Sequence, residues 1–199
     1  MVLASPASGG YVGVGVAERS HPPSAWGAGD AVLDHLHPRG AMTSGRDPEG
    51  AFRWIVGILE DQAIPFLLVG GLAARAHGAS RDLADIDFYI PSERFRDVVA
   101  AASEYVTAGP ERVVSEHWDI TFMKLEYAGQ PIELGAAADV RIFSRPAGEW
   151  VPEEVDLADA VEKEVFGLLV PVMTREKLLA YKHRLQRSVD LADIRDLEA

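Results

Sequence analysis

The 199-residue sequence contains no cysteine. Its absence excludes disulfide bonds, thiolate metal sites and cysteine nucleophiles, and it fits a reducing compartment such as the cytoplasm. Long apolar runs are missing too, since none approaches the ~20 residues that a membrane-spanning helix needs. The first residues also lack a basic stretch followed by a continuous apolar one, so no signal peptide is expected. The sequence therefore predicts a cytoplasmic protein without a membrane partner.

Positive charge is scarce. Lys and Arg number 19 against 31 Asp and Glu, which gives a formal net charge of -12. Nearly all of this charge lies after residue 45, where the net value is -11. A body this acidic repels phosphate backbones at long range. Binding to extended nucleic acid is therefore disfavoured.

The first 45 residues are rich in Gly, Pro, Ala and Ser and show no sustained hydrophobic period. This composition predicts a disordered N-terminal extension. Residues 11–16 alternate like a strand, but glycine at every second position leaves one face with nothing to pack. Met42 lies where the composition changes and is a candidate start of the functional chain. We expect residues 46–199 to form one domain.

A helical pattern begins at Asp47, which can cap a helix with Pro48 in its first turn. Apolar residues then recur at helical spacing up to Leu59. The apolar run at residues 66–69 predicts a buried strand, and residues 85–90 predict a second one. A diglycine and a short helix up to residue 77 separate the two strands.

The second half of the chain predicts further strands and helices. A helix capped by Ser92 is followed by a hairpin of residues 120–125 and 132–134, which turns near Gly129. Residues 165–172 predict a single strand. Two helices are then expected, one capped by Thr174 and a last short one near Ser188. Strands mixed with helices place the chain in the α/β class.

The Asp85-Ile86-Asp87 segment carries the strongest chemical signal. Residues two apart on a strand point to the same face, so the two carboxylates lie side by side. Like charges that close repel each other, and divalent cations between them relieve the repulsion. Such carboxylates can hold two Mg²⁺ about 4 Å apart. This pair predicts a metal site, and the alternative is a solvent-facing strand edge.

Thirteen residues separate the diglycine Gly70-Gly71 from this acidic pair. Glycine lets a phosphate approach the backbone closely, and a strand-to-helix turn offers free N–H donors. Each motif alone is weak. Together, in the order strand, Gly-Gly, helix, strand, Asp-x-Asp, they predict a nucleotide site.

With these motifs the sequence resembles the nucleotidyltransferases of the DNA polymerase beta superfamily. It is most similar to the small members, which are the lincosamide and aminoglycoside adenylyltransferases and the AbiE-type toxin nucleotidyltransferases. The resemblance covers residues 52–197, including the closing Leu179-Ala180-Tyr181-Lys182 segment. It implies a small mixed sheet with flanking helices and a C-terminal helical portion from about residue 174.

The resemblance assigns roles to individual residues. Gly70 and Gly71 would seat the phosphates, and Asp85 and Asp87 would bind two Mg²⁺. Glu133 is the matching position for the third carboxylate, as metal ligand or general base. The family more often has serine at the second glycine and aspartate at the third carboxylate. Two acids compete with Glu133 for this role, namely Asp119 and Glu126.

Three basic residues are candidates for contact with the triphosphate. Arg75 and Arg81 flank the diglycine loop, and a guanidinium suits phosphate; each could instead pair with Asp82 or Asp85. Lys182 belongs to a helix expected near the site, and its alternative is a surface lysine. Separately, residues 187–193 are predicted to form ion pairs at a helix junction.

The predicted activity is Mg²⁺-dependent transfer of a nucleoside monophosphate, with ATP as the expected donor, to an acceptor hydroxyl. We expect a small-molecule acceptor of the aminoglycoside or lincosamide kind, because acidic residues follow the third carboxylate and would attract a cation. Two alternatives stay open: a toxin–antitoxin enzyme that modifies tRNA or a partner protein, and a non-catalytic nucleotide-binding module. The acids expected around the acceptor are Glu126, Asp139, Glu149, Glu153 and Glu154.

Overall fold

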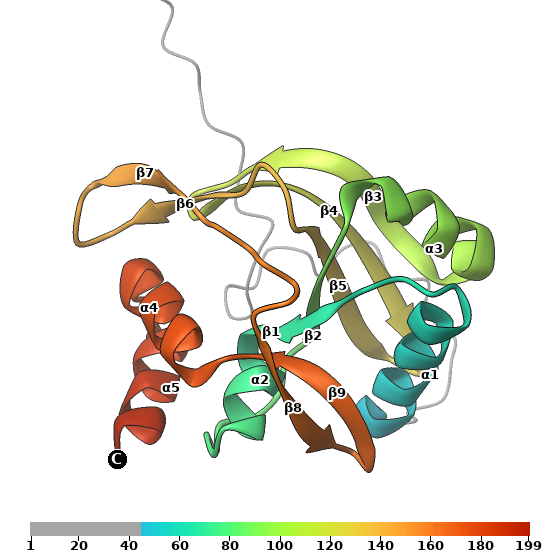
Figure 1. The fold of residues 1–199 in the computed structure, drawn as a ribbon, viewed down its shortest axis with the longest axis horizontal. Helices are drawn as coiled ribbons and strands as arrows, with labels where there is room; N and C mark the ends of the chain where they lie inside the picture. The colour runs from blue at the N-terminus through green and yellow to red at the C-terminus, as the bar shows by residue number, and fades with distance from the viewer. Residues whose placement is uncertain (1–44) are drawn as a thin grey trace, which may run out of the picture.

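The computed structural model describes residues 45–199 (Figure 1). The expectations for the N-terminal extension, including the alternating segment at 11–16 and Met42, lie outside these residues. Within them, no helix is long and apolar enough to cross a membrane. The helices are α1 (Pro48–Asp61), α2 (Gly70–Ala76), α3 (Phe95–Ala102), α4 (Arg175–Leu185) and α5 (Ser188–Glu198). The strands are β1 (Leu67–Val69), β2 (Ile86–Ile90), β3 (Val106–Val114), β4 (Trp118–Tyr127), β5 (Gln130–Ala136), β6 (Arg141–Ser144), β7 (Glu149–Pro152), β8 (Ala160–Val165) and β9 (Leu168–Met173).

The strands form one mixed sheet of nine strands in the order β7-β6-β4-β5-β2-β1-β9-β8, with β3 paired to β4. At its centre β2 runs antiparallel to β1 and parallel to β5. This architecture confirms the α/β class and the C-terminal helical portion. The sheet is larger than expected, because β3 and the β6–β7 hairpin extend it beyond the strands that the sequence indicated.

Helix α1 follows the sequence pattern closely. The Asp47 side chain accepts a hydrogen bond from the backbone N–H of Gly50 at 2.8 Å, which satisfies one of the free donors of the first turn. The apolar stripe of the helix is buried, and the Phe52 ring stacks on Phe88 of β2 with centroids 6.0 Å apart. This contact fixes α1 on the sheet beside the strand that carries Asp87.

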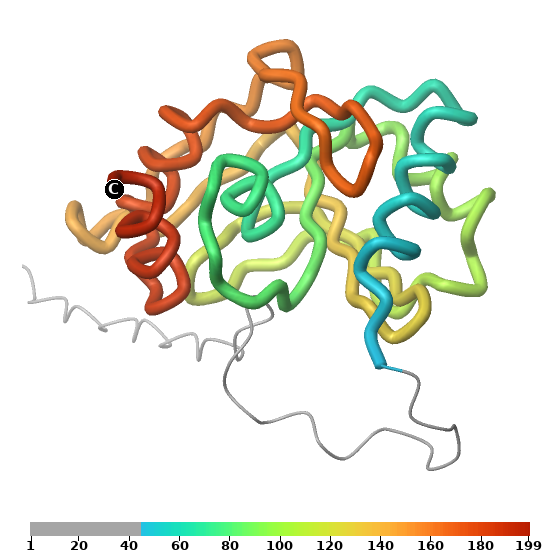
Figure 2. Tube along the Cα trace, turned by 90° about the horizontal axis from the view of Figure 1, so that it is seen from below, coloured from blue at the N-terminus to red at the C-terminus, as the bar shows by residue number. Residues whose placement is uncertain are grey.

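The two C-terminal helices pack against each other and against α2, as seen from below in Figure 2. Thr174 caps α4 as predicted, accepting a hydrogen bond from the Lys177 backbone N–H at 3.4 Å. Gln186 ends α4 in a left-handed conformation, so that α5 turns back along it. The start of α5 lies close to the loop between α2 and β2, since Ser188 lines a shallow pocket together with Arg81 and Asp82 of that loop.

Two local predictions are wrong. Residues 165–172 form no single strand, because Phe166 and Gly167 both have positive φ, 49° and 75°. Two such residues are typical of a tight hairpin turn, and the segment divides between β8 and β9. Ser92 does not cap a helix directly. It begins a 3₁₀ turn, and α3 starts only at Phe95.

Candidate functional site

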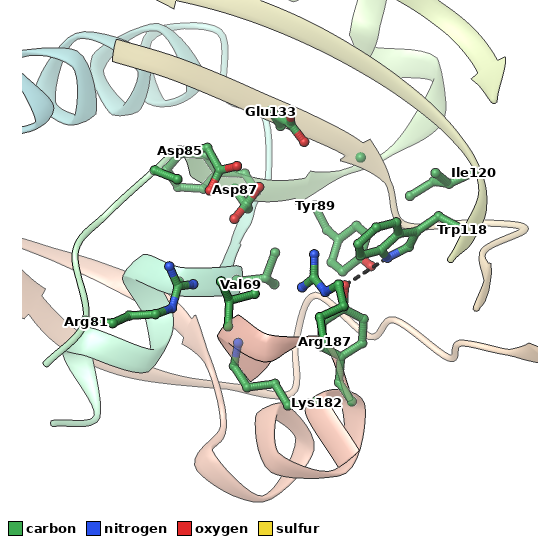
Figure 3. A pocket seen from close by; sticks show the side chains of 17 residues that line it. Val69, Arg81, Asp85, Asp87, Tyr89, Trp118, Ile120, Glu133, Lys182 and Arg187 are labelled. Carbon is green, nitrogen blue, oxygen red and sulfur yellow. Dashed lines mark hydrogen bonds between the residues drawn. The ribbon is translucent and has the colours of Figure 1, made fainter. Parts of the chain in front are cut away.

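Three carboxylates converge where β2 and β5 run side by side (Figure 3). Asp87 and Glu133 are Cα partners in the parallel β2–β5 register. Asp85 precedes β2, two residues from Asp87 and therefore on the same side. One oxygen from each of the three carboxylates lies within 4.8 Å of the others. The structure thus brings together the three acids that the sequence singled out.

The two competing acids lie elsewhere. Asp119 accepts a hydrogen bond from Arg112 Nε at 2.6 Å, and Glu126 is exposed opposite Pro131 on the β4–β5 hairpin. Neither belongs to the acidic cluster. Glu133 is therefore the third carboxylate that the geometry supports.

The cluster carries unfavourable charge. Glu133 is buried, and burial, together with the nearby Asp85, raises its pKa to about 7 despite an ion pair with Lys124 at 2.6 Å. Burial, with Asp85 and Glu133 adding to it, also raises the pKa of Asp87 well above its usual range. Among the residues that the structure describes, none gives Glu133 Oε2 a hydrogen bond. Carboxylate oxygens are the ligands that Mg²⁺ prefers, and a buried acceptor without a partner suits a cation. These residues fit the predicted metal.

The diglycine packs tightly between groups of opposite charge. Gly70 has φ of +65°, and a side chain there would overlap the carboxylate of Asp87. A side chain on Gly71 would overlap the guanidinium of Arg81. Glycine at these two positions therefore lets the backbone pass close to both the acidic cluster and a cation.

Two basic residues converge on Asp193 from different elements. Arg81 Nε and Lys182 Nζ each lie 2.8 Å from its carboxylate. Lys182 is only 1% exposed, so it is not a surface lysine. Arg81 donates to the side chain of Asp193 and to the Asp82 backbone carbonyl, and not to an acid of its own loop. Arg75 is exposed on α2 and does not line the cavity described below.

Arg187 makes the predicted ion pair at the α4–α5 junction. Its Nε and Nη2 donate to the two oxygens of Asp190 at 2.7 and 3.0 Å. Its guanidinium also lies 4.6 Å from the ring centre of Trp118. The Trp118 indole N–H donates to the Tyr181 hydroxyl at 2.9 Å, shown by the dashed line in Figure 3.

The three carboxylates, the diglycine and several of the basic and aromatic side chains described above line one cavity that is open to solvent. The carboxylates form one wall, and Arg81, Lys182 and Arg187 approach from the other side (Figure 3). An aromatic and apolar part completes the lining. The residues of this part are Phe88, Tyr89, Trp118, Ile120, Gly135 and Tyr181. Sequence reasoning gave Arg187 only an ion pair and did not find Trp118. The only local sequence signal for the aromatic and apolar part is that Trp118 and Ile120 lie two residues apart, and therefore on the same face of β4.

The acids expected around the acceptor do not line the cavity. Among the described residues that line the cavity, the acids are only Asp85, Asp87 and Glu133. Glu153, one of the expected rim residues, is buried against Arg184 at 2.9 Å. These acids lie near the third carboxylate in the sequence, but the fold does not bring them to the cavity.

Comparison with solved structures identifies the fold. A Thermotoga maritima protein provisionally assigned as a nucleotidyltransferase aligns with a TM-score of 0.56 and 22% identity, over 77% of this chain and 91% of its own. The lincosamide adenylyltransferase LnuA, with lincomycin bound, aligns with a TM-score of 0.52 and 17% identity, over 78% and 99%. The enzyme ANT(2″)-Ia, in complex with adenylyl-2″-tobramycin, aligns with a TM-score of 0.50 and 16% identity, over 75% and 86%.

No protein-family profile and no curated protein sequence matches the chain. At these identities, the structural likeness establishes the fold. The chain has the polymerase-beta-like nucleotidyltransferase fold, which confirms the fold that the sequence resemblance implied.

Proposed function

We propose that residues 46–199 form a domain that transfers a nucleoside monophosphate from an NTP, preferably ATP, to the hydroxyl of a small molecule. The observation that carries this proposal is the convergence of Asp85, Asp87 and Glu133 within 4.8 Å, across one cavity from three cations. The fold alone would not suffice, because folds host many functions. LnuA and ANT(2″)-Ia, whose structures hold an antibiotic or its adenylylated form, support a small-molecule acceptor.

The carboxylates would hold the metal. Asp85, Asp87 and Glu133 would supply the oxygen ligands for two Mg²⁺, and Glu133 would also take the acceptor proton. When bound, the metal would activate the acceptor hydroxyl and stabilise charge on the leaving pyrophosphate. The acceptor oxygen forms a bond to the α-phosphorus, and the bond from that phosphorus to the pyrophosphate oxygen breaks.

The opposite side of the cavity would hold the triphosphate. Gly70, Gly71 and Arg81 line the cavity together, where phosphate oxygens would bind. Lys182 and Arg187 add positive charge, and the three cations exceed by one the two aspartates that pair with them, Asp190 and Asp193. A net positive wall facing an acidic metal wall suits a magnesium-bound triphosphate, because each wall attracts one part of that ligand.

The test is a transfer assay with each of the four NTPs, Mg²⁺, and lincomycin or tobramycin as acceptor. Mass spectrometry would detect the added nucleotide, and ATP should give the largest signal. Asp85→Asn and Asp87→Asn should each lower transfer by a factor of about 100 or more, since both remove a metal ligand. Asp159→Asn is the matched control, because this exposed acid pairs with Lys177 outside the cavity. Full activity in either ligand variant would reject the metal site.

Binding of Mg²⁺–ATP provides a second readout that needs no acceptor. The wild-type protein should show a higher melting temperature with Mg²⁺–ATP than with either component alone, and Asp87→Asn should lose this increase. If the wild-type protein neither binds Mg²⁺–NTP nor consumes it, nucleotidyl transfer is ruled out.

A further inference from the structure

The cavity has two ends, and the proposed transfer gives each end a different substrate. In nucleotidyl transfer, the attacking and leaving oxygens lie roughly in line on opposite sides of the phosphorus. The space for phosphates lies beside Gly70, Gly71 and Arg81. If pyrophosphate leaves on that side, the acceptor must approach from the other side of Asp87 and Glu133. This step rests on the proposed function.

Strand geometry identifies what lies on that other side. Two residues beyond Asp87 and Glu133, on the same face of the sheet, are Tyr89 and Gly135, which are themselves Cα partners. Two residues along a strand correspond to about 7 Å. The neighbouring strand β4 adds Ile120 to the same cavity. The acceptor end therefore begins one side chain away from the metal ligands.

The chemistry of this end is aromatic and apolar. We use the name aromatic end for Tyr89, Trp118, Ile120, Gly135 and Tyr181. Trp118 and Ile120 are at most 2% exposed, and the hydrogen bond between Trp118 and Tyr181 fixes two of the rings. A side-chain carbon on Gly135 would come within 3.0 Å of both Ile120 and Tyr89. The cavity is therefore open beside Gly135 only because glycine has no side chain.

The charged groups near the aromatic end do not favour the binding of a polycation. The guanidinium of Arg187 already lies over the Trp118 ring, where Asp190 holds it. Among the described residues of the cavity, every acid belongs to the cluster that would be occupied by metal. An acceptor with several ammonium groups would find no carboxylate of its own there. An apolar group would instead gain free energy by leaving water.

We propose that the aromatic end binds the acceptor, and that the acceptor is a hydroxyl compound with an apolar or aromatic group and at most one positive charge. Its apolar part packs between Trp118, Ile120 and the tyrosine rings. Its hydroxyl reaches Glu133 and the metal site. This assignment narrows the acceptor class, because polycationic amino sugars are excluded and amphiphilic sugars are favoured.

Three probes with a hydroxylated ring test the assignment: phenyl β-D-glucoside, methyl β-D-glucoside and tobramycin. Each is titrated by calorimetry into the full-length protein, with Mg²⁺ and with or without the non-transferable analogue α,β-methylene-ATP. The phenyl glucoside should bind about tenfold or more tightly than the methyl glucoside, because the ring is buried. Tobramycin should bind most weakly.

Two variants test whether the preference for the phenyl glucoside arises in the cavity. Trp118→Leu removes an aromatic wall, and Gly135→Ala narrows the floor with a smaller risk to folding. Each should reduce the advantage of the phenyl over the methyl glucoside to about threefold or less. Leu169→Ala is the control for non-specific apolar binding, because Leu169 is 62% exposed on β9 and lies outside the cavity. It should keep the full preference.

The outcomes separate this assignment from the proposed function. Tobramycin binding as tightly as the phenyl glucoside overturns the assignment, and so does an equal or undetectable affinity for both glucosides. A preference that survives Gly135→Ala in a folded protein also overturns it. If the wild-type protein shows the preference but fails to bind the ATP analogue, the aromatic end stands and nucleotidyl transfer fails.

Discussion

The two walls of the cavity handle buried charge in opposite ways. On the β2–β5 wall, Asp85, Asp87 and Glu133 gather like charges, and burial raises the pKa of Asp87 and of Glu133. On the α4–α5 wall, Lys182 and Asp193 are at most 1% exposed and lie 2.8 Å apart as an ion pair. Only the second wall is electrostatically satisfied within the protein itself.

The paired residues of the α4–α5 wall are therefore expected to stabilise the fold, and the carboxylates of the β2–β5 wall to bind a ligand. A buried, paired charge becomes costly when its partner is removed, because the remaining charge stays in a poorly polar environment. A cluster of like charges becomes less costly when one member is removed. Mutations on the two walls should therefore shift stability in opposite directions.

The largest effect is expected on the paired wall. Asp193→Ala leaves Lys182 buried with only a distant partner, and it also takes away the carboxylate that Arg81 contacts. We expect the free energy of unfolding to fall by about 3–5 kcal/mol, measured by urea denaturation. Asp159→Ala, which breaks an exposed pair, should cost about 1 kcal/mol or less. Equal losses in the two variants would contradict the comparison.

The carboxylate wall should respond in the other direction. In metal-free buffer, Asp87→Asn should leave the free energy of unfolding unchanged or raise it by up to about 1 kcal/mol, because a like charge is removed. Mg²⁺–ATP at a hundred times its dissociation constant should stabilise the wild-type protein by about 2.7 kcal/mol and the variant much less. A clear loss of metal-free stability would show that Asp87 supports the fold.

The glycines between the walls allow a sharper comparison. Gly70→Ala should lower the free energy of unfolding by about 1–2 kcal/mol, since φ of +65° disfavours a side chain. It should also weaken Mg²⁺–ATP binding, because the new carbon displaces the Asp87 carboxylate. Gly57→Ala is the matched control, lying inside α1 with open space around it. It should raise stability by up to about 1 kcal/mol, as measured by the same urea titration.

Much of the acidic wall could be predicted because its signals are local. The alternation of Asp85 and Asp87 follows from strand geometry, and the caps at Asp47 and Thr174 are read within four residues. Glu133 could be proposed but not separated from Asp119 and Glu126. That choice depends on the β2–β5 register, which pairs residues far apart in the chain.

The aromatic end and the acceptor rim could not be predicted. Trp118 and Tyr181 are 63 residues apart and meet only through tertiary packing. Glu153 follows the third carboxylate in sequence, yet it pairs with Arg184 and does not line the cavity. The β8–β9 turn is a different case. Gly167 in an apolar run is a known turn signal, and reading it would have divided the predicted strand.

The smallest effect on stability is expected at Glu153. This residue tests whether burial, rather than a nearby cation, determines the direction of a carboxylate's pKa shift. Burial raises its pKa above the ordinary value of 4.5, and Arg184 opposes this without cancelling it. Because the folded protein binds this proton more tightly than the unfolded chain, its contribution is most favourable below pH 4.5 and declines as pH rises toward the folded pKa. The stability difference between the wild-type protein and Glu153→Gln should therefore shift against the wild type as pH increases from about 4.5, as measured by urea denaturation without metal. A shift in favour of the wild type would mean that Arg184 outweighs burial, and that Glu153 belongs with the paired wall.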